Sequence, residues 1–400
     1  MSELPSSKLL LFTAAALVAL SPLAMDSYLP AIPALADYLG VSAGAVSWTV
    51  SNFLLGLAAG QLIGGAISDQ KGRRPVVLFG LILFALSSLA LVFIDSLWSA
   101  NGWRLLQGFS GGVVMVSAIA MVKDITPPER LAAQIAQIIF VVMLTPIIAP
   151  IIGAAMLPLG WQSIFILSLV AAVLLLLLVV GWVQESNAHI TGKLSLSGAL
   201  AQYGYVLRFQ RDGVYIARWQ ALSLSCSALL GLVFVTASGP IIMDEYGLAP
   251  EQFPYAFGAF AVSILVGNRI GKWMVGRFPA HIIFRRGVWI QLAAIVALLV
   301  VLGFVQPPLW LALALMMVAF GTGAAIGPSG SAMFLNLLDK HFGSATAFET
   351  TLRFSLGALL GSLATALPIG HLLATTLIMF VSLLLSLWSS TVTRRFWRSL

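Results

Sequence analysis

The sequence alternates between apolar runs of roughly 20 residues and short polar stretches that hold most of its charged residues. An apolar helix of this length can cross the hydrocarbon core of a bilayer, which is about 30 Å thick. The runs between Gly, Pro and charge clusters have predicted bounds of 8–32, 46–68, 75–94, 98–122, 131–157, 161–183, 214–240, 253–275, 283–304, 308–332, 344–368 and 372–392. The pattern therefore predicts an all-α membrane protein with twelve transmembrane helices.

The composition agrees with this class of protein. Hydrophobic residues make up 60% of the 400 residues and charged residues 9%, against about 25% charged in ordinary soluble chains. The single cysteine, Cys226, excludes an intramolecular disulfide framework. Four histidines and scattered carboxylates show no metal-ligand spacing, so we expect no metal ion and no cofactor. A membrane enzyme is disfavoured, because the spans offer too few nucleophiles, bases or paired carboxylates.

The positions of the basic residues predict the orientation in the membrane, since Lys- and Arg-rich loops stay cytoplasmic. The residues that fall in every second loop or at the termini are Lys8, Lys71, Arg73, Arg74, Lys123, Arg130, Lys193, Arg208, Arg211, Lys272, Arg277, Arg285, Arg286, Lys340, Arg394, Arg395 and Arg398. The alternate loops carry acidic residues and neither Lys nor Arg. Both termini are therefore expected in the cytoplasm, and the net charge of +7 reflects topology rather than a nucleic-acid partner.

The longest polar stretch, 184–213, divides the spans into two sets of six. We predict an N-terminal six-helix bundle at 1–183, a cytoplasmic linker at 184–213 and a C-terminal six-helix bundle at 214–400. This halving is typical of duplicated transporters, whose substrate site lies between the repeats. A receptor would need a sensing or signalling domain, and an ATP-driven pump would need a G-x-x-x-x-G-K-[ST] loop; the sequence contains neither.

The loop between spans 2 and 3 carries a recognisable motif. Residues 65–75 read G-A-I-S-D-Q-K-G-R-R-P, which resembles the loop pattern G-x-L-a-D-r-x-G-r-k of the major facilitator superfamily. Its Gly, Asp and basic positions are occupied by Gly65, Asp69, Gly72, Arg73 and Arg74. Glycines permit a tight turn, and Asp69 can pair with basic groups at helix ends. We interpret it as a cytoplasmic gating loop.

Three further segments narrow the resemblance. Span 1 contains M-D-S-Y-L-P-A-I-P at 25–33, which is similar to the first-helix signature of the bicyclomycin-resistance (Bcr/CflA) drug/H+ antiporters. In span 4, R-L-L-Q-G at 104–108 resembles the antiporter motif found there. Span 5 keeps Pro150 and Gly153 of the antiporter pattern, with other residues at three of its glycine positions. The start of span 6 at 161–165 and Arg353-Phe354 in span 11 also resemble that family.

The resemblance implies the major facilitator fold in the bacterial inner membrane. It implies a proton-coupled antiporter that exports drug-like amphipathic small molecules by alternating access. The alternative is a dedicated proton-driven exporter of one endogenous metabolite, such as a siderophore, nucleoside or sugar. The expected partners are a small-molecule substrate, protons and the lipid bilayer, and we expect a monomer.

Asp26 and Arg104 are the candidate proton-coupling residues. An ionisable group at mid-bilayer costs about 2.5–3.5 kcal/mol even on insertion scales, so each needs a reason to be there. Span 1 is predicted to run outward and span 4 inward, which brings the two residues to similar depth. Competition between proton and substrate for Asp26 would couple the two fluxes. The alternative is a static buried ion pair that fixes helix packing.

Span 11 contains a second pair of charges. Glu349 and Arg353 lie four residues apart, which places them on one face of the helix. A self-neutralising pair is the favoured explanation, and a weak second proton site is the alternative.

Glycines and large flexible side chains suggest packing and recognition roles. Glycines recur every four residues at 56–64 of span 2 and at 357 and 361 of span 11, which predicts a sliding seam between the halves. Pro and Gly residues in spans 5 and 10 predict bends. The candidate substrate-cavity residues are Asn52, Phe53, Gln61, Met115, Phe140, Met143 and Phe234.

Overall fold

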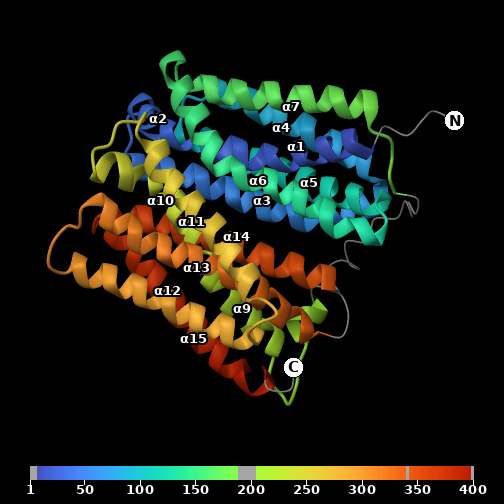
Figure 1. Ribbon diagram of the computed structural model, residues 1–400. Helices are drawn as coiled ribbons and strands as arrows, with labels where there is room; N and C mark the ends of the chain where they lie inside the picture. The colour runs from blue at the N-terminus through green and yellow to red at the C-terminus, as the bar shows by residue number, and fades with distance from the viewer. Residues whose placement is uncertain (1–6, 188–203, 339–341, 398–400) are drawn as a thin grey trace. The chain divides into compact units, whose positions relative to one another are not determined.

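Every regular element in the described part of the chain is helical (Figure 1). The computed structural model describes residues 7–187, 204–338 and 342–397. Within them, 11 candidate spans are long and apolar enough to cross a membrane. The region predicted as span 11 is a helix of 25 residues that is not among these 11, because Glu349, Arg353 and several Ser and Thr residues lower its hydropathy. The predicted all-α membrane class is confirmed, while the count of twelve spans stays a prediction.

The chain forms two compact units. The first contains the described residues up to 187 together with 249–254, and the second contains 204–248 and the residues from 255 onward. Most of the predicted linker, 188–203, lies outside the described residues, as do Lys193, Lys340 and Arg398. The linker bounds, and with them the predicted bundle limits, stay predictions.

The first unit is built from long helices that pack side by side (Figure 1). Its elements are α1 (Ser7–Asp26), η1 (Leu29–Ala31), α2 (Ile32–Leu39), α3 (Ala43–Lys71), α4 (Arg73–Val92), α5 (Leu97–Ile125), α6 (Pro128–Met156), η2 (Leu157–Leu159) and α7 (Gln162–Trp182). Helix α3 has its most extensive contact with α5, while α4 lies against α5 and α7. Helix α1 packs against α5, α6 and α7.

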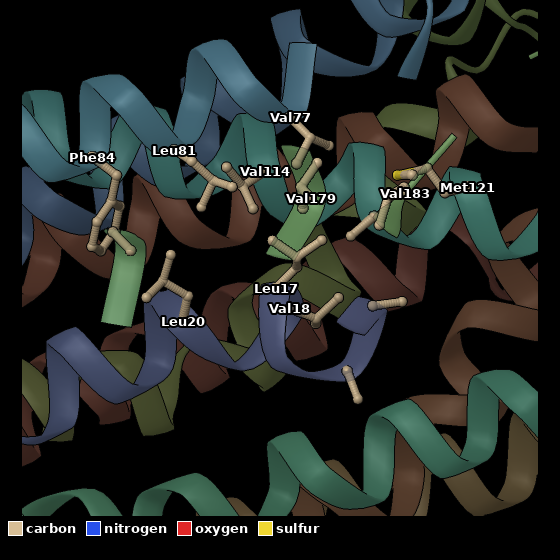
Figure 2. Packing of buried hydrophobic residues seen from close by; sticks show 14 of the residues in the cluster. Leu17, Val18, Leu20, Val77, Leu81, Phe84, Val114, Met121, Val179 and Val183 are labelled. Atoms are coloured by element: carbon tan, nitrogen blue, oxygen red, sulfur yellow. The ribbon is translucent and has the colours of Figure 1, made fainter. Parts of the chain in front are cut away.

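A buried apolar cluster joins these helices (Figure 2). Leu17 and Leu20 of α1 lie in one cluster with Leu81 and Phe84 of α4 and with Val114 of α5. These side chains are at most 2% exposed. Since lipid tails are as apolar as these residues, close van der Waals packing rather than exclusion from water stabilises the arrangement.

The second unit is also built from packed helices. Its elements are α9 (Ile216–Ala228), α10 (Leu230–Gly239), the π-helix η3 (Pro240–Glu245), α11 (Phe253–Met274), α12 (Ala280–Leu302), α13 (Leu309–Asn336), α14 (Phe342–Ala366) and α15 (His371–Trp397). Helix α12 packs against α13 and α15, and α9 and α10 both contact α14. Ser223 and Ser386 exchange hydrogen bonds between α9 and α15, each hydroxyl donating to the other residue's carbonyl oxygen.

Two spans are interrupted where the sequence predicted continuous helices. The first span is broken after Asp26 and then continues through α2 to Leu39, seven residues beyond its predicted end. Pro33 permits this continuation because it lies in the first turn of α2, where its missing N–H breaks no bond. The seventh span is divided between α9 and α10 at Leu229. In contrast, α6 continues as one α-helix through Pro146 and Pro150.

The predicted sliding seam is wrong for the glycines that suggested it. A Cβ atom at Gly56 or Gly60 would overlap the backbone of α5, and one at Gly64 would come within 2.8 Å of Val113. In the second unit, Gly357 and Gly361 face α10 in the same way. The glycine faces are filled by helices of their own unit, so these residues allow close packing inside each unit.

Gly60→Ala tests this packing role. The added methyl group would overlap the carbonyl oxygen of Phe109, and overpacking of this kind costs about 1–3 kcal/mol. We expect a lower midpoint of thermal unfolding for the purified protein in detergent. Gly102→Ala in α5 is the matched control, since nothing lies within 4 Å of its Cβ position. Equal midpoints for the two variants would contradict the assignment.

Candidate functional site

The candidate site is built around the interruption of the first span. Helix α1 ends at Asp26, because Pro30 has no N–H to donate to the carbonyl oxygen of Asp26. The chain then passes through Ser27 and Tyr28 before helical structure resumes at Leu29. Asp26, Ser27 and Tyr28 are 2%, 0% and 1% exposed. A carboxyl group is thus enclosed at the point where the helix leaves its last carbonyl groups unpaired.

Arg104 of α5 lies against this helix end. Its guanidinium donates from Nη1 to Gln107 Oε1 at 2.8 Å and to the carbonyl oxygen of Ala24 at 3.4 Å. Its central carbon lies 4.6 Å from the ring centroid of Tyr28 and 4.5 Å from that of Phe53. The positive charge of Arg104 is favoured by the negative end of the α1 helix dipole. It is also favoured by the faces of the two aromatic rings.

The motif segments of spans 5 and 6 also meet at this interruption. A Cβ atom at Gly153 of α6 would overlap the carbonyl oxygen of Ser27, so only glycine allows the two backbones to approach this closely. The ring of Tyr28 packs 5.5 Å from that of Phe165 in α7. Its hydroxyl donates to Thr49 Oγ1 at 2.9 Å, since the Thr49 hydroxyl donates to the carbonyl oxygen of Val46. Four segments that resemble one family therefore assemble around one helix break.

The structure does not pair Asp26 with Arg104. Among the described residues, no ion pair or hydrogen bond joins their side chains, and the Asp26 carboxyl has no polar partner. Nε and Nη2 of Arg104 are likewise buried without a hydrogen-bond partner. The alternative of a static ion pair does not describe this conformation. Unsatisfied buried groups of this kind are rare and favour a functional role over a packing role.

The α3–α4 loop, by contrast, is held by a dense network. Gly72 adopts a φ of 100°, which glycine tolerates and which sets the start of α4 at Arg73. The Arg73 guanidinium pairs with Asp69, donates to Asp124 Oδ2 at 2.9 Å and donates to Ser68 Oγ at 2.9 Å. Asp69 therefore pairs with a basic group at a helix end, and Gly65 accepts a bond from the Ser68 hydroxyl.

Glu185 completes this network and was not anticipated from the sequence. Its carboxylate accepts the backbone N–H of Arg73 at 2.8 Å and that of Arg74 at 3.0 Å, which caps α4. The Arg74 side chain donates to the carbonyl oxygen of Val180 at 2.9 Å. Two arginines in the first turn are unfavourable beside the positive end of a helix dipole, so a carboxylate here offsets them. The lack of acidic residues in the first turn of α4 was the available signal.

The second unit has its own stabilised interruption. Gln291 of α12 is fully buried and donates to the carbonyl oxygens of Ser227 at 3.2 Å and Ala319 at 3.0 Å. The Ser227 hydroxyl donates back to Gln291 Oε1 at 2.7 Å. These bonds satisfy the backbone where α9 gives way to α10. One side-chain amide therefore ties α9, α12 and α13 together.

The predicted substrate-cavity residues divide into packed and partly exposed side chains. Asn52 donates to Asn101 Oδ1 at 2.7 Å, and Gln61 lies 3.3 Å from the sulfur of Met115. Phe53, under Arg104, and Phe234, among other phenylalanines of the second unit, are 0% exposed. Met143 is half-buried and Phe140 is 60% exposed. Phe53 and Phe234 have clear packing roles, and the cavity stays a prediction.

Candidate ligands for a metal ion do not gather in this structure. Across residues 7–187, 204–338 and 342–397, no three His, Cys, Asp or Glu side chains are grouped closely enough to hold one.

The fold and the polar cluster around the α1 break define a polytopic helical membrane protein with internal polar contacts. A family model described as Major Facilitator Superfamily matches residues 14–362. The chain belongs to this superfamily. It is therefore a multi-pass membrane transporter, as predicted, rather than an enzyme, and in bacteria such proteins lie in the inner membrane.

Several named proteins are similar to the chain over most of its length. A bicyclomycin resistance protein homolog from Haemophilus influenzae is 28% identical, covering 92% of this chain and 91% of the relative. A chloramphenicol resistance protein from Pseudomonas aeruginosa is 29% identical, covering 86% and 80%. The resemblance predicted from the motifs is confirmed by relatives of these names.

Solved structures with a similar fold support the architecture. A POT family transporter in complex with 5-aminolevulinic acid superimposes with a TM-score of 0.78 at 15% identity, covering 98% of this chain and 96% of that structure. A D-xylose-proton symporter gives a TM-score of 0.71 at 15% identity, covering 94% and 96%. These similarities establish the major facilitator fold.

Glu185→Ala tests the cap on α4. Loss of a capping carboxylate costs about 1 kcal/mol, which corresponds to about fivefold faster exchange of the amides that it binds. We expect this acceleration in the peptide that contains Arg73 and Arg74, measured by hydrogen–deuterium exchange with mass spectrometry. Glu129→Ala, at an exposed position in the first turn of α6, should leave this peptide unchanged. An unchanged rate in Glu185→Ala would contradict the cap.

Proposed function

We propose that the protein is a proton-coupled antiporter that exports drug-like amphipathic small molecules by alternating access. The observation that carries the proposal is the enclosed carboxyl of Asp26 at the break in the first span, which has no polar partner among the residues that the structure describes. A structural acid in this environment would be paired, since an isolated buried charge is strongly unfavourable. An acid that takes up and releases a proton has to be free of a permanent partner.

Arg104 supplies the second part of the proposed mechanism. Its two unpartnered groups, Nε and Nη2, can donate to an oxygen atom that arrives after the conformation changes. The oxygen can come from ionised Asp26 or from the cargo. Because the same donors cannot satisfy both, cargo binding and ionisation of Asp26 are linked. Proton release and cargo uptake then alternate at one site.

The names of the relatives support the cargo class. The Haemophilus influenzae and Pseudomonas aeruginosa proteins are named for resistance to bicyclomycin and chloramphenicol. Other similar proteins are named multidrug resistance proteins, including one from Shewanella oneidensis that is 27% identical. We extend drug export to this chain on that basis, and we assign the proton as the driving ion from Asp26.

Asp26→Asn tests the coupling. The amide keeps the size of the side chain and cannot carry a proton, so export driven by a pH gradient should fall to the rate of protein-free vesicles. The measurement is chloramphenicol transport in proteoliposomes with an imposed gradient. Asp37→Asn, at an exposed position in α2, is the matched control and should transport like the parent protein.

Two results would contradict the proposal. One is undiminished, pH-dependent transport by Asp26→Asn in protein that elutes as a folded monomer. The other is the absence of proton release when purified parent protein binds any drug of a broad panel in weakly buffered solution. Binding of one metabolite alone, such as a nucleoside, would instead favour a dedicated exporter.

A further inference from the structure

The second unit contains a buried carboxylate that the proposed mechanism does not use. Glu349 of α14 is 5% exposed, and its Oε1 atom is buried without a hydrogen-bond partner. Helix α14 contacts α9, α10, α13 and α15, so the residue lies on a helix that is packed on several sides. A carboxylate oxygen enclosed in this way either carries a proton or needs a cation beside it.

Arg353 is an incomplete partner for this carboxylate. Its Nε lies 4.0 Å from Glu349 Oε1, beyond hydrogen-bonding distance, although the two residues are one turn apart. The Arg353 side chain is 32% exposed, and its guanidinium carbon lies 5.6 Å from the ring centroid of Phe354. The arginine is therefore loosely held and can move away from Glu349 without breaking a close contact.

The helices packed against α14 bring polar groups to it, and their charged or titratable residues are Arg218 of α9 and His371, Arg394 and Arg395 of α15. The Ser225 hydroxyl of α9 donates to the backbone carbonyl oxygen of Glu349 at 3.4 Å, which fixes this turn of α14. The sequences of α10 and α13 contain no ionisable residue. Arg218 of α9 is already engaged, donating to the carbonyl oxygen of Leu207 and lying against the Tyr215 ring. Among the described residues, Arg353 is the one basic side chain that forms an ion pair with Glu349.

We propose that Glu349 binds the positively charged group of cationic amphipathic cargo, with Arg353 as a tethered cation that the cargo displaces. The proposal rests on the proposed function and assigns it a substrate class. An organic cation would approach Oε1 more closely than the 4.0 Å of the internal pair, which strengthens the attraction in a medium of low dielectric constant. Neutral cargo has no charge to place there and gains nothing from Glu349.

Glu349→Gln is the direct test. Ethidium, a permanent cation, and chloramphenicol, a neutral compound, serve as probes, and their equilibrium dissociation constants are measured with the purified full-length protein in nanodiscs. We expect the constant for ethidium to rise about tenfold or more and that for chloramphenicol to change by less than about twofold, since only the cation loses a charge partner. Equal changes for both probes, or no change for either, would overturn the proposal.

Arg353→Gln gives a result of opposite sign. Removal of the tethered cation should lower the dissociation constant of ethidium, by about threefold or more, and leave that of chloramphenicol unchanged. A static ion pair predicts the contrary, because losing either partner would then destabilise the unit without discriminating between the probes. Weaker ethidium binding by Arg353→Gln would therefore count against displacement.

A measurement on the parent protein covers the case in which the variants do not fold. Carbodiimides such as dicyclohexylcarbodiimide modify protonated carboxyl groups in apolar surroundings, and mass spectrometry locates the modified residue. We expect ethidium to protect Glu349 from modification and chloramphenicol to leave it reactive. Modification that ethidium does not slow would show that Glu349 titrates without contacting the cation, and this would overturn the proposal.

The two proposals fail separately. Ethidium binding is measured at equilibrium without a proton gradient. The absence of proton-driven transport by the parent protein would therefore contradict the antiport mechanism and leave the Glu349 experiment intact. Conversely, chloramphenicol export can be intact while Glu349→Gln leaves the dissociation constant of ethidium unchanged. That result would contradict the cation site alone.

Discussion

The break in the first span is the constraint on which the rest of the site depends. Pro30 removes the N–H that would have bonded to the carbonyl oxygen of Asp26, and the chain turns at Ser27 and Tyr28 inside the buried part of the unit. Backbone groups in such surroundings need partners or close neighbours. Arg104 reaches a freed carbonyl of α1, and Gly153 lets α6 approach the break.

Two polar regions of the first unit differ in how completely they are satisfied. The α3–α4 loop places Arg73 among two carboxylates and a hydroxyl, while Glu185 closes the helix end, so almost every charge has a partner. At the α1 break, two nitrogen atoms of Arg104 are buried without a partner, and the described residues offer none to the Asp26 carboxyl. A satisfied network stabilises one conformation, whereas unsatisfied groups stabilise whatever state supplies their partners. The first arrangement suits an anchor, and the second suits a site that changes state.

The second unit follows the same principle with different residues. Its first span is also divided, and Gln291 satisfies the division with an amide instead of a charge. The buried acid of this unit lies elsewhere, on α14, whose sequence is too polar for it to appear among the candidate spans. Polar residues that depress the hydropathy of a packed membrane helix have to be retained for a purpose other than membrane insertion. Glu349 and Arg353 account for much of that polarity.

The sequence by itself determined the class of protein, because a bilayer imposes a fixed length and apolarity on every helix that crosses it. It also located Asp26 and Arg104, which are charges within apolar spans, while the resemblance to family motifs located Gly153 and the α3–α4 loop. Only the tertiary structure showed that Asp26 and Arg104 do not pair with each other, that Glu185 caps α4, and that the spaced glycines face helices of their own unit. Hydropathy indicates which segments lie in the membrane, but it does not identify the neighbour that each face of a helix meets. Those neighbours are decided by packing between segments far apart in the chain.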